Sequence, residues 1–185
     1  MLTSLVVPRP IGWVSTWDSN GQPNLAPFSF FNAFSASPMF VGVSVGERRG
    51  VQKDTLVNIR SSGAFCVNVV SEPLLEAMNQ TSAEVQPEVD EFELSGLECV
   101  PSEEVSAPFV GECSAVLECL VFQEVELLKS TNTLVIGEVV GVLLRPELEF
   151  EEGTHRVTHG TLRAVGRLSG NDYLLPRHVR GIPRP

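Results

Sequence analysis

Residues 11–34, IGWVSTWDSNGQPNLAPFSFFNAF, have the pattern of a β-hairpin and decide the fold class of this chain. Apolar and small residues alternate from Ile11 to Trp17, as they do in a strand that buries one face. Asp18-Ser19-Asn20-Gly21 follows, and a cluster of these residue types is a strong turn signal. We therefore expect residues 24–34 to return as a second, antiparallel strand.

Strand patterns recur along the rest of the chain, and helical patterns are few. Residues 39–45 alternate cleanly, and further strands are expected over residues 64–70, 113–122, 124–129 and 134–144. One helix is expected from Thr55, ended by Gly63, and a second over residues 73–80, capped by Ser71. Because helices do not alternate with the strands, the sequence favours a mainly β fold, an antiparallel barrel or sandwich, over a parallel α/β sheet.

The composition is that of a globular protein, with 43% hydrophobic and 19% charged residues in a chain of 185. We expect a single domain over residues 1–185, with an acidic surface excursion at 81–110 and a C-terminal extension at 170–185. From Glu84 to Glu104 there are eight carboxylates and no Lys or Arg. The net charge of −10 argues against nucleic acid as a partner. No apolar run has membrane-spanning length, so we expect no membrane insertion and a cytoplasmic location.

The segment Gly46–Ile59, GERRGVQKDTLVNI, has the features of a phosphate site. Arg48, Arg49 and Lys53 are crowded together just before the helix expected from Thr55, with Asp54 as its N-cap. Free N–H groups and the positive dipole end at a helix N-terminus favour phosphate, to which Lys53 adds a charge and Thr55 a hydroxyl. A capped surface helix beside a solvated basic turn explains the same residues. The GxGxxG and GxxxxGK[ST] nucleotide motifs are absent, so a barrel would have to hold any nucleotide-like ligand.

The four cysteines, at positions 66, 99, 113 and 119, include no close CxxC pair, and we expect all four to be reduced. A zinc site can be drawn from Cys113 and Cys119 with His155 or His159. Their spacings are not those of a structural zinc module, and a surface-loop role for the histidines is the preferred interpretation. We therefore predict no metal site.

Four blocks in order, PRPIGWVST (8–16), NLAPFSFFN (24–32), GVQKDTLVNI (50–59) and LVIGEV (134–139), resemble the FMN-binding split-barrel flavoproteins. The resemblance covers roughly residues 2–173 and is strongest to the flavin-reductase-like branch that includes nitrilotriacetate-monooxygenase component B and flavoredoxin. It implies a six-stranded antiparallel Greek-key split barrel with a few short helices. It also implies a homodimer, with one FMN per subunit near the dimer interface.

The resemblance assigns FMN-binding roles to residues in each of the first three blocks. It implies that Lys53, Asp54 and Thr55, with Arg48 nearby, take the phosphate. Ser44 is a further candidate for the ribityl chain or the phosphate. The block Trp13, Val14, Ser15 and Thr16 would lie along the flavin, and the block Ser29, Phe30, Phe31 and Asn32 would face the ring edge and ribityl chain. A flavin also needs an aromatic wall, for which Trp13, Phe30 or Phe34 are candidates.

The expected activity is that of an NAD(P)H:flavin oxidoreductase, which passes hydride from NADH or NADPH through bound FMN to free flavin or another acceptor. Short flavin reductases of this kind place a His near the nicotinamide, whereas the corresponding loop here, Ser130–Thr133, has none. An FMN-containing electron carrier that serves a protein redox partner is therefore the alternative, and a haem-binding split barrel is a third. His159 or Arg163 is a candidate for lining the open face of the flavin, and Tyr173 with Arg177 for covering the pocket or joining the dimer.

Overall fold

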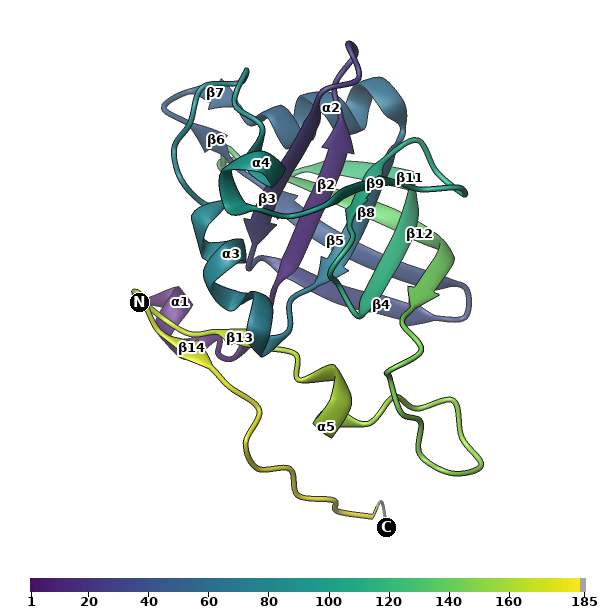
Figure 1. Ribbon diagram of the computed structural model, residues 1–185. Helices are drawn as coiled ribbons and strands as arrows, with labels where there is room; N and C mark the ends of the chain where they lie inside the picture. Colours follow the sequence, from purple (N-terminus) through teal and green to yellow (C-terminus); the bar gives the residue numbers. More distant parts are fainter. Residues whose placement is uncertain (184–185) are drawn as a thin grey trace.

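A curled antiparallel sheet of seven strands forms the centre of the computed structural model, which describes residues 1–183. The strand order is β3-β2-β8-β11-β12-β5-β4 (Figure 1). The strands are β2 (Gly12–Trp17), β3 (Pro23–Phe28), β4 (Phe31–Ala36), β5 (Met39–Val45), β8 (Ala64–Val69), β11 (Ala115–Glu126) and β12 (Thr133–Leu144).

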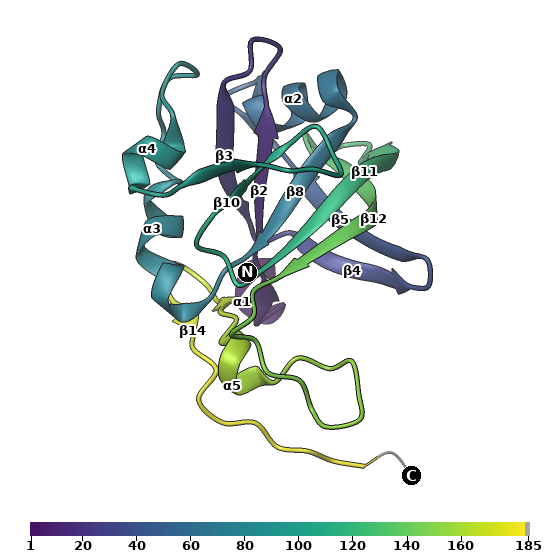
Figure 2. The same ribbon diagram turned by 45° about the vertical axis from the view of Figure 1, so that its right-hand side comes forward.

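The two edges of this sheet come from one bent segment of chain. Strands β3 and β4 are separated only by Ser29 and Phe30, yet β3 pairs with β2 and β4 pairs with β5 at the opposite edge. Next to the bend, the N–H of Ser44 donates to the carbonyl of Phe30 at 2.8 Å. The sheet therefore curls into a split barrel (Figure 2), and the single strand expected over residues 24–34 is wrong. The main sheet has seven strands, where six were expected.

Strand β11 replaces two expected strands, and those predictions were also wrong. The segments predicted at 113–122 and 124–129 form one strand, which pairs with β12 along its whole length. A register shift between Val121 and Gln123 leaves Phe122 as an extra residue. Such a bulge bends the strand and keeps the pairing on both sides of it. Phe122 lies on the outer face, where its ring centroid is 4.8 Å from that of Phe40.

Helix α2 (Asp54–Ser62) covers one end of the barrel (Figure 1) and ends at Gly63, whose φ of 69° fits the left-handed C-cap position. Lys53, not Asp54, is the N-cap residue, because Lys53 still has extended backbone angles while Asp54 is already helical. The carboxylate of Asp54 lies in the first turn, where it complements the helix dipole. The second expected helix is present as η1 (Glu72–Leu74) and α3 (Leu75–Gln80), with Ser71 at the N-cap but no hydrogen bond from its side chain.

Two hydrophobic clusters lie on the two faces of the curled sheet. The interior of the barrel contains Val14, Val43, Phe65 and other buried residues. The second cluster lies on the outside of β2, β8 and β11, with Trp13 at its centre.

The acidic segment expected as a surface excursion covers this second cluster. It forms α4 (Glu91–Ser95), β9 (Cys99–Pro101) and β10 (Pro108–Val110). Phe92, Ala107 and Val110 are almost fully buried. The excursion therefore completes the core, because its apolar residues pack inward while most of its carboxylates face solvent.

Segments from near the two ends of the chain pair beside the barrel. There, β1 (Arg9–Pro10), β13 (Gly166–Arg167) and β14 (Tyr173–Leu174) form a small sheet near α1 (Leu2–Leu5). The remaining elements are the hairpin β6 (Glu47–Arg48) and β7 (Val51–Gln52), and α5 (His159–Leu162). Within residues 1–183, no helix is both long enough and apolar enough to cross a membrane.

Candidate functional site

A cavity of about 320 Å³ lies at the bend between β3 and β4. The bend brings together polar side chains and aromatic rings from the block predicted to face a flavin. They are joined by residues of the N-terminal segment and of β5 and β12. The lining is Val6, Pro8, Arg9, Pro10, Ser29, Phe30, Phe31, Asn32, Phe34, Gly42, Ser44 and Leu134. Four predicted residues, Ser29 to Asn32, and Ser44 therefore share one site with Phe34.

Two glycines let aromatic rings of this block lie close to the backbone. A Cβ added at Gly42 would come within 2.3 Å of Phe34 Cε2, and one added at Gly12 would come within 2.7 Å of Phe31 Cδ2. Phe34 is 59% exposed and Phe30 is 45% exposed, so these two rings have free faces. The wall is therefore flat, aromatic and open to a ligand.

Ser44 links the cavity to the loop that follows β11. Its hydroxyl accepts a hydrogen bond from Asn132 Nδ2 at 3.0 Å. Asn132 belongs to the Ser130–Thr133 loop, which we singled out because it lacks a histidine. The structure thus places an amide side chain at the edge of the cavity.

Arg9 is the residue of this site that our sequence predictions missed. Its side chain donates to the carbonyls of Thr3 (2.7 Å), Val6 (2.8 Å) and Leu168 (2.8 Å), and its Nε donates to Ser29 Oγ (3.3 Å). The residue is only 7% exposed. Its place between two prolines in the PRPIGWVST block restricts the backbone but does not reveal these contacts.

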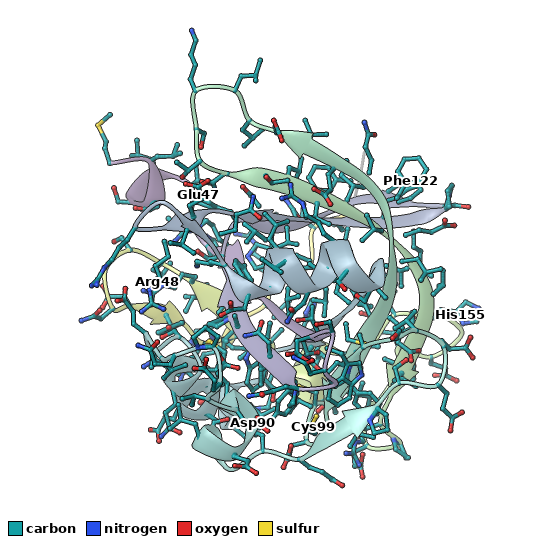
Figure 3. The ribbon with its side chains drawn as sticks, turned by 90° about the horizontal axis from the view of Figure 1, so that it is seen from above. Glu47, Arg48, Asp90, Cys99, Phe122 and His155 are labelled. Carbon is teal, nitrogen blue, oxygen red and sulfur yellow. The ribbon has the colours of Figure 1, made fainter. Side chains whose placement is uncertain are left out.

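The basic turn is a tight hairpin whose arginines are already partnered. Arg49 and Gly50 have φ values of 51° and 79°, and between β6 and β7 they make a two-residue turn of the kind that needs positive φ. Arg48 and Arg49 both contact Glu84 Oε2, at 2.8 and 3.3 Å, and the hydrogen bond from Arg48 holds the pKa of Glu84 below its usual value. Figure 3 shows Arg48 toward the side of the barrel opposite Phe122.

Lys53 follows this turn in the chain and lies against Phe28. Its Nζ is 5.0 Å from the centroid of the Phe28 ring, and Phe28 directly precedes the Ser29 bend. Burial lowers the pKa of Lys53, the nearby Arg48 lowers it further, and Glu84 opposes the shift. In the described part of the chain Lys53 forms no ion pair, and no side chain caps the first turn of α2. An ammonium group and a helix N-terminus are therefore both available to an anion.

The hydroxyl of Thr55 faces the protein interior and is not directed at this anion position. It donates to Asn24 Oδ1 at 2.9 Å, and Thr55 is only 1% exposed. Asn24 Nδ2 in turn donates to Glu91, 3.2 Å from Oε1, and burial raises the pKa of that carboxyl group. At this position the backbone N–H, and not the hydroxyl that we expected, is the group suited to a phosphate.

The block from Trp13 to Thr16 is buried and does not line the cavity. The indole N–H of Trp13 donates to Thr81 Oγ1 at 2.9 Å, and the hydroxyl of Ser15 donates to the carbonyl of Pro108 at 2.6 Å. Thr16 Oγ1 accepts from Asn58 Nδ2 at 3.1 Å, and Val14 points into the barrel core. Of the three aromatic residues considered for the wall, only Phe30 and Phe34 lie at the site.

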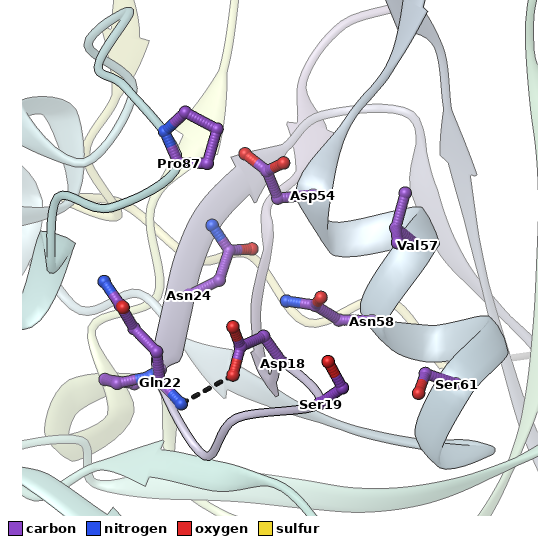
Figure 4. Close-up of a pocket in the computed structure, with 10 residues that line it drawn as sticks. Asp18, Ser19, Gln22, Asn24, Asp54, Val57, Asn58, Ser61 and Pro87 are labelled. Carbon is purple, nitrogen blue, oxygen red and sulfur yellow. Dashed lines mark hydrogen bonds between the residues drawn. The ribbon is translucent and has the colours of Figure 1, made fainter.

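A second pocket, of about 220 Å³, lies between the β2–β3 turn and α2 (Figure 4). Asp18 and Asp54 line it together with amide and hydroxyl side chains, among them Asn24, Asn58 and Ser61. No basic residue lines this pocket. Its carboxylates would repel a phosphate, so the first cavity is the better candidate for an anionic ligand.

The structure does not bring together the cysteines that we considered for a zinc site. Cys113 packs in the outer cluster and Cys119 in the barrel core, and burial raises the pKa of each thiol to about 12. No group of three metal-binding side chains occurs within residues 1–183.

The C-terminal candidates Arg163, Arg177 and Tyr173 contact η1 and α3 and not the cavity. Arg163 and Arg177 contact Glu72, at 2.6 and 3.5 Å, and the hydroxyl of Tyr173 donates to Asn79 Oδ1 at 3.0 Å. His159 opens α5 and is not among the cavity-lining residues.

These side chains fit a ligand that has a planar aromatic ring at one end and a phosphate at the other. Phe30 and Phe34 offer ring faces, while Ser29, Asn32 and Ser44 offer donors and acceptors to the edge of a ring. Lys53 and the first turn of α2 offer a positive end beyond Phe28. Flavin cofactors combine these two features.

Comparison with known proteins points to the same ligand class. The family model described as "Flavin reductase like domain" matches residues 4–161. An uncharacterized protein of Halalkalibacterium halodurans is 39% identical over 100% of this chain and 90% of its own. Nitrilotriacetate monooxygenase component B from Bacillus cereus has a TM-score of 0.90 and 31% identity over 98% of this chain and 90% of its own. The 2-nitrobenzoate 2-nitroreductase of Pseudomonas fluorescens has a TM-score of 0.88 and 30% identity over 100% of this chain and 88% of its own.

Proposed function

Because the chain belongs to the flavin reductase-like family, a family of flavin-related oxidoreductases, we propose that it binds FMN at the β3–β4 bend. The observation that carries this proposal is the pairing of an aromatic-walled cavity with Lys53, a cation without an ion-pair partner in residues 1–183. The ring lies in the cavity and the phosphate lies at Lys53 and the first amides of α2. Because Phe28 contacts Lys53 and leads directly into the bend, the ribityl chain runs along this strand end.

The residues of the site then have distinct tasks. Phe30 and Phe34 pack against the ring and exclude water from it. Ser29, Asn32 and Ser44 hydrogen-bond to its polar edge, and Asn132 holds the Ser44 hydroxyl in place. Bound flavin supplies the hydride chemistry, so no side-chain acid or base is required of the protein. Arg48 adds positive charge to the phosphate position when Glu84 is displaced.

We propose that the activity is an NAD(P)H:flavin oxidoreductase reaction, in which NADH or NADPH donates hydride and free flavin or another acceptor receives it. The openness of the site supports this, because a flavin packed on one side against Phe30 and Phe34 leaves its other face free for a second planar ligand. The relative named 2-nitrobenzoate 2-nitroreductase makes nitroaromatic acids a second class of acceptor to test.

The second candidate function is an electron carrier that exchanges electrons with a protein partner. It is favoured by the Ser130–Thr133 loop, where Asn132 and not a histidine reaches the edge of the cavity. The net charge of −10 would suit docking to a basic redox partner.

We also propose that the protein is a homodimer in which the flavin lies near the interface. The supporting observation is a set of exposed apolar side chains on β4, β5, β11 and β12. Its members are Phe34, Met39, Leu120, Phe122, Val140 and Val142. Exposed apolar surface of this kind marks interaction sites. Sedimentation equilibrium should give twice the monomer mass of 20.1 kDa, and a monomer would refute this part of the proposal.

The visible absorption spectrum of the purified protein, recorded after incubation with FMN and desalting, tests the proposed function. Retained flavin bands are expected, and a colourless protein would refute FMN binding. Anaerobic addition of NADH or NADPH then separates the two candidate functions. Rapid bleaching supports the reductase, while bleaching only with dithionite supports the carrier.

A further inference from the structure

Arg9 is a buried cation for which the described chain supplies no counter-ion. No carboxylate of residues 1–183 forms an ion pair with it. The residue is 93% buried, and removing a guanidinium group from water is costly unless something compensates its charge. Arginine keeps its charge at every pH at which proteins are folded, so protonation does not relieve this cost.

The hydrogen bonds of Arg9 fix its position but do not cancel its charge. Three backbone carbonyls and the Ser29 hydroxyl accept from it, and each of these is a neutral dipole. These bonds tie the N-terminal segment, the β3–β4 bend and Leu168 around one guanidinium group. The result is a rigid positive charge in the wall of the cavity. Arg9 is the one ionisable side chain among the lining residues.

We propose that Arg9 makes this cavity bind anionic reduced FMN more tightly than oxidised FMN. This inference rests on the proposed function. The ring of oxidised flavin is neutral, whereas reduced flavin that has lost its N1 proton carries a negative charge on the pyrimidine edge. A fixed cation beside the ring stabilises the charged ring and leaves the neutral ring nearly unaffected. Lys53 and Arg48 face the phosphate, which both forms carry, so they strengthen both complexes alike.

The experiment compares the dissociation constants of FMN and dithionite-reduced FMN, measured under anaerobic conditions above the N1 pKa of free reduced FMN. The wild type should bind the reduced form about tenfold more tightly or better, and tenfold corresponds to about 30 mV in a two-electron potential. Arg9→Met should abolish this preference, because it removes the charge and keeps an unbranched apolar chain. Arg9→Lys should retain most of the preference, although it loses the forked hydrogen bonds.

These variants separate an electrostatic role from a merely structural one. If Arg9 only holds the structure together, Arg9→Met and Arg9→Lys should each weaken the binding of oxidised and reduced FMN by the same factor. An unchanged ratio of the two dissociation constants in Arg9→Met would overturn the proposal. Arg60→Met is the matched control, since it removes a positive charge from the last turn of α2, outside the cavity, and it should preserve the ratio.

A second measurement needs no variant and remains decisive if Arg9→Met does not fold. Reduced FMN bound to the wild type should take up its N1 proton at a lower pH than free reduced FMN measured alongside. Protonation at the same or a higher pH would overturn the proposal. If the wild type binds neither redox form, the proposed function itself fails. If it binds both forms equally, only the inference about Arg9 fails.

Discussion

The hydroxyl of Thr55 donates to Asn24 Oδ1 at 2.9 Å, and this bond joins the first turn of α2 to strand β3. Asn24 Nδ2 in turn donates to the buried carboxyl group of Glu91 on α4. The N-terminus of α2, and with it Lys53, is therefore positioned by a polar network under the helix and not by a capping side chain. The phosphate site that we propose depends on this network for its geometry.

Thr55→Val should destabilise the fold by about 1–3 kcal/mol, because Asn24 Oδ1 loses its buried donor. Thr55→Ser keeps the hydroxyl and should lose much less stability. Urea unfolding of both variants measures the difference. A valine variant as stable as the wild type would show that the bond does not contribute to stability.

Lys53→Met should weaken FMN binding roughly tenfold to a hundredfold, since a hydrogen bond between charged groups contributes about 1.5–3 kcal/mol. Methionine preserves an apolar contact with Phe28, so the fold should remain. Arg60→Met removes a positive charge from the last turn of the same helix, far from the proposed phosphate, and is the matched control. Fluorescence titration measures the dissociation constant of FMN for each variant. Equal values for Lys53→Met and Arg60→Met would contradict the phosphate assignment.

The affinity for FMN should also fall in alkaline solution. The pKa of Lys53 is lowered from its ordinary value of 10.5, so the side chain begins to lose its positive charge below that pH. Phosphate binding favours the charged amine, and the dissociation constant should therefore rise as the pH approaches 10.5. Lys53→Met should lack this dependence, and an identical pH profile in the variant would refute the role of Lys53.

Glu91→Gln should be as stable as the wild type at pH 7, or more stable. Burial raises the pKa of Glu91 above 4.5 in the folded state, so the fold favours the neutral carboxyl group. The stability that this preference gives is complete below pH 4.5 and is lost as the pH rises through the folded-state pKa.

The difference in unfolding free energy between Glu91→Gln and the wild type should therefore grow above pH 4.5 and then level off. Unfolding curves at several pH values measure it, and Glu93→Gln, on the exposed face of the same helix, is the control. A difference in unfolding free energy that does not change with pH would contradict the raised pKa of Glu91.

Gly42→Ala should mainly lower the affinity for FMN, whereas Gly137→Ala should mainly lower the stability of the fold. The added Cβ at Gly42 meets Phe34, whose exposed ring can move, so the cavity changes shape and FMN affinity falls with little loss of stability. At Gly137 the added Cβ would lie 2.5 Å from Phe65 Cζ, and Phe65 is fully buried. Overpacking there should cost about 1–3 kcal/mol. Thermal unfolding and FMN titration of both variants measure this contrast, which equal behaviour would contradict.

Much of the β framework was predictable because its strands bury alternate residues. The expected bounds of residues 39–45 match β5, and those of the strands after residues 63 and 133 lie within one residue of β8 and β12. The bend at Ser29 and Phe30 was not predictable from pattern, since apolar residues continue on both sides of it. It exists because the two halves pair with opposite edges of the sheet, which is a tertiary effect.

The candidate site was predictable only in part for the same reason. The side chains of Ser29 to Asn32 do line one cavity, and Lys53 lies against Phe28, the residue before the bend. The burial of Trp13 depends on α3 and α4 packing over β2, and Thr55 turns inward because Asn24 lies opposite it. Arg9 was missed because its neighbours, Thr3, Ser29 and Leu168, are brought together only by the fold.

A crystal structure of the protein with FMN tests the central claim most directly. The account predicts the phosphate within hydrogen-bonding distance of Lys53 Nζ and the first amides of α2, with the ring in the cavity against Phe30 or Phe34. Flavin density in the acidic pocket lined by Asp18 and Asp54, or a phosphate away from Lys53, would contradict it.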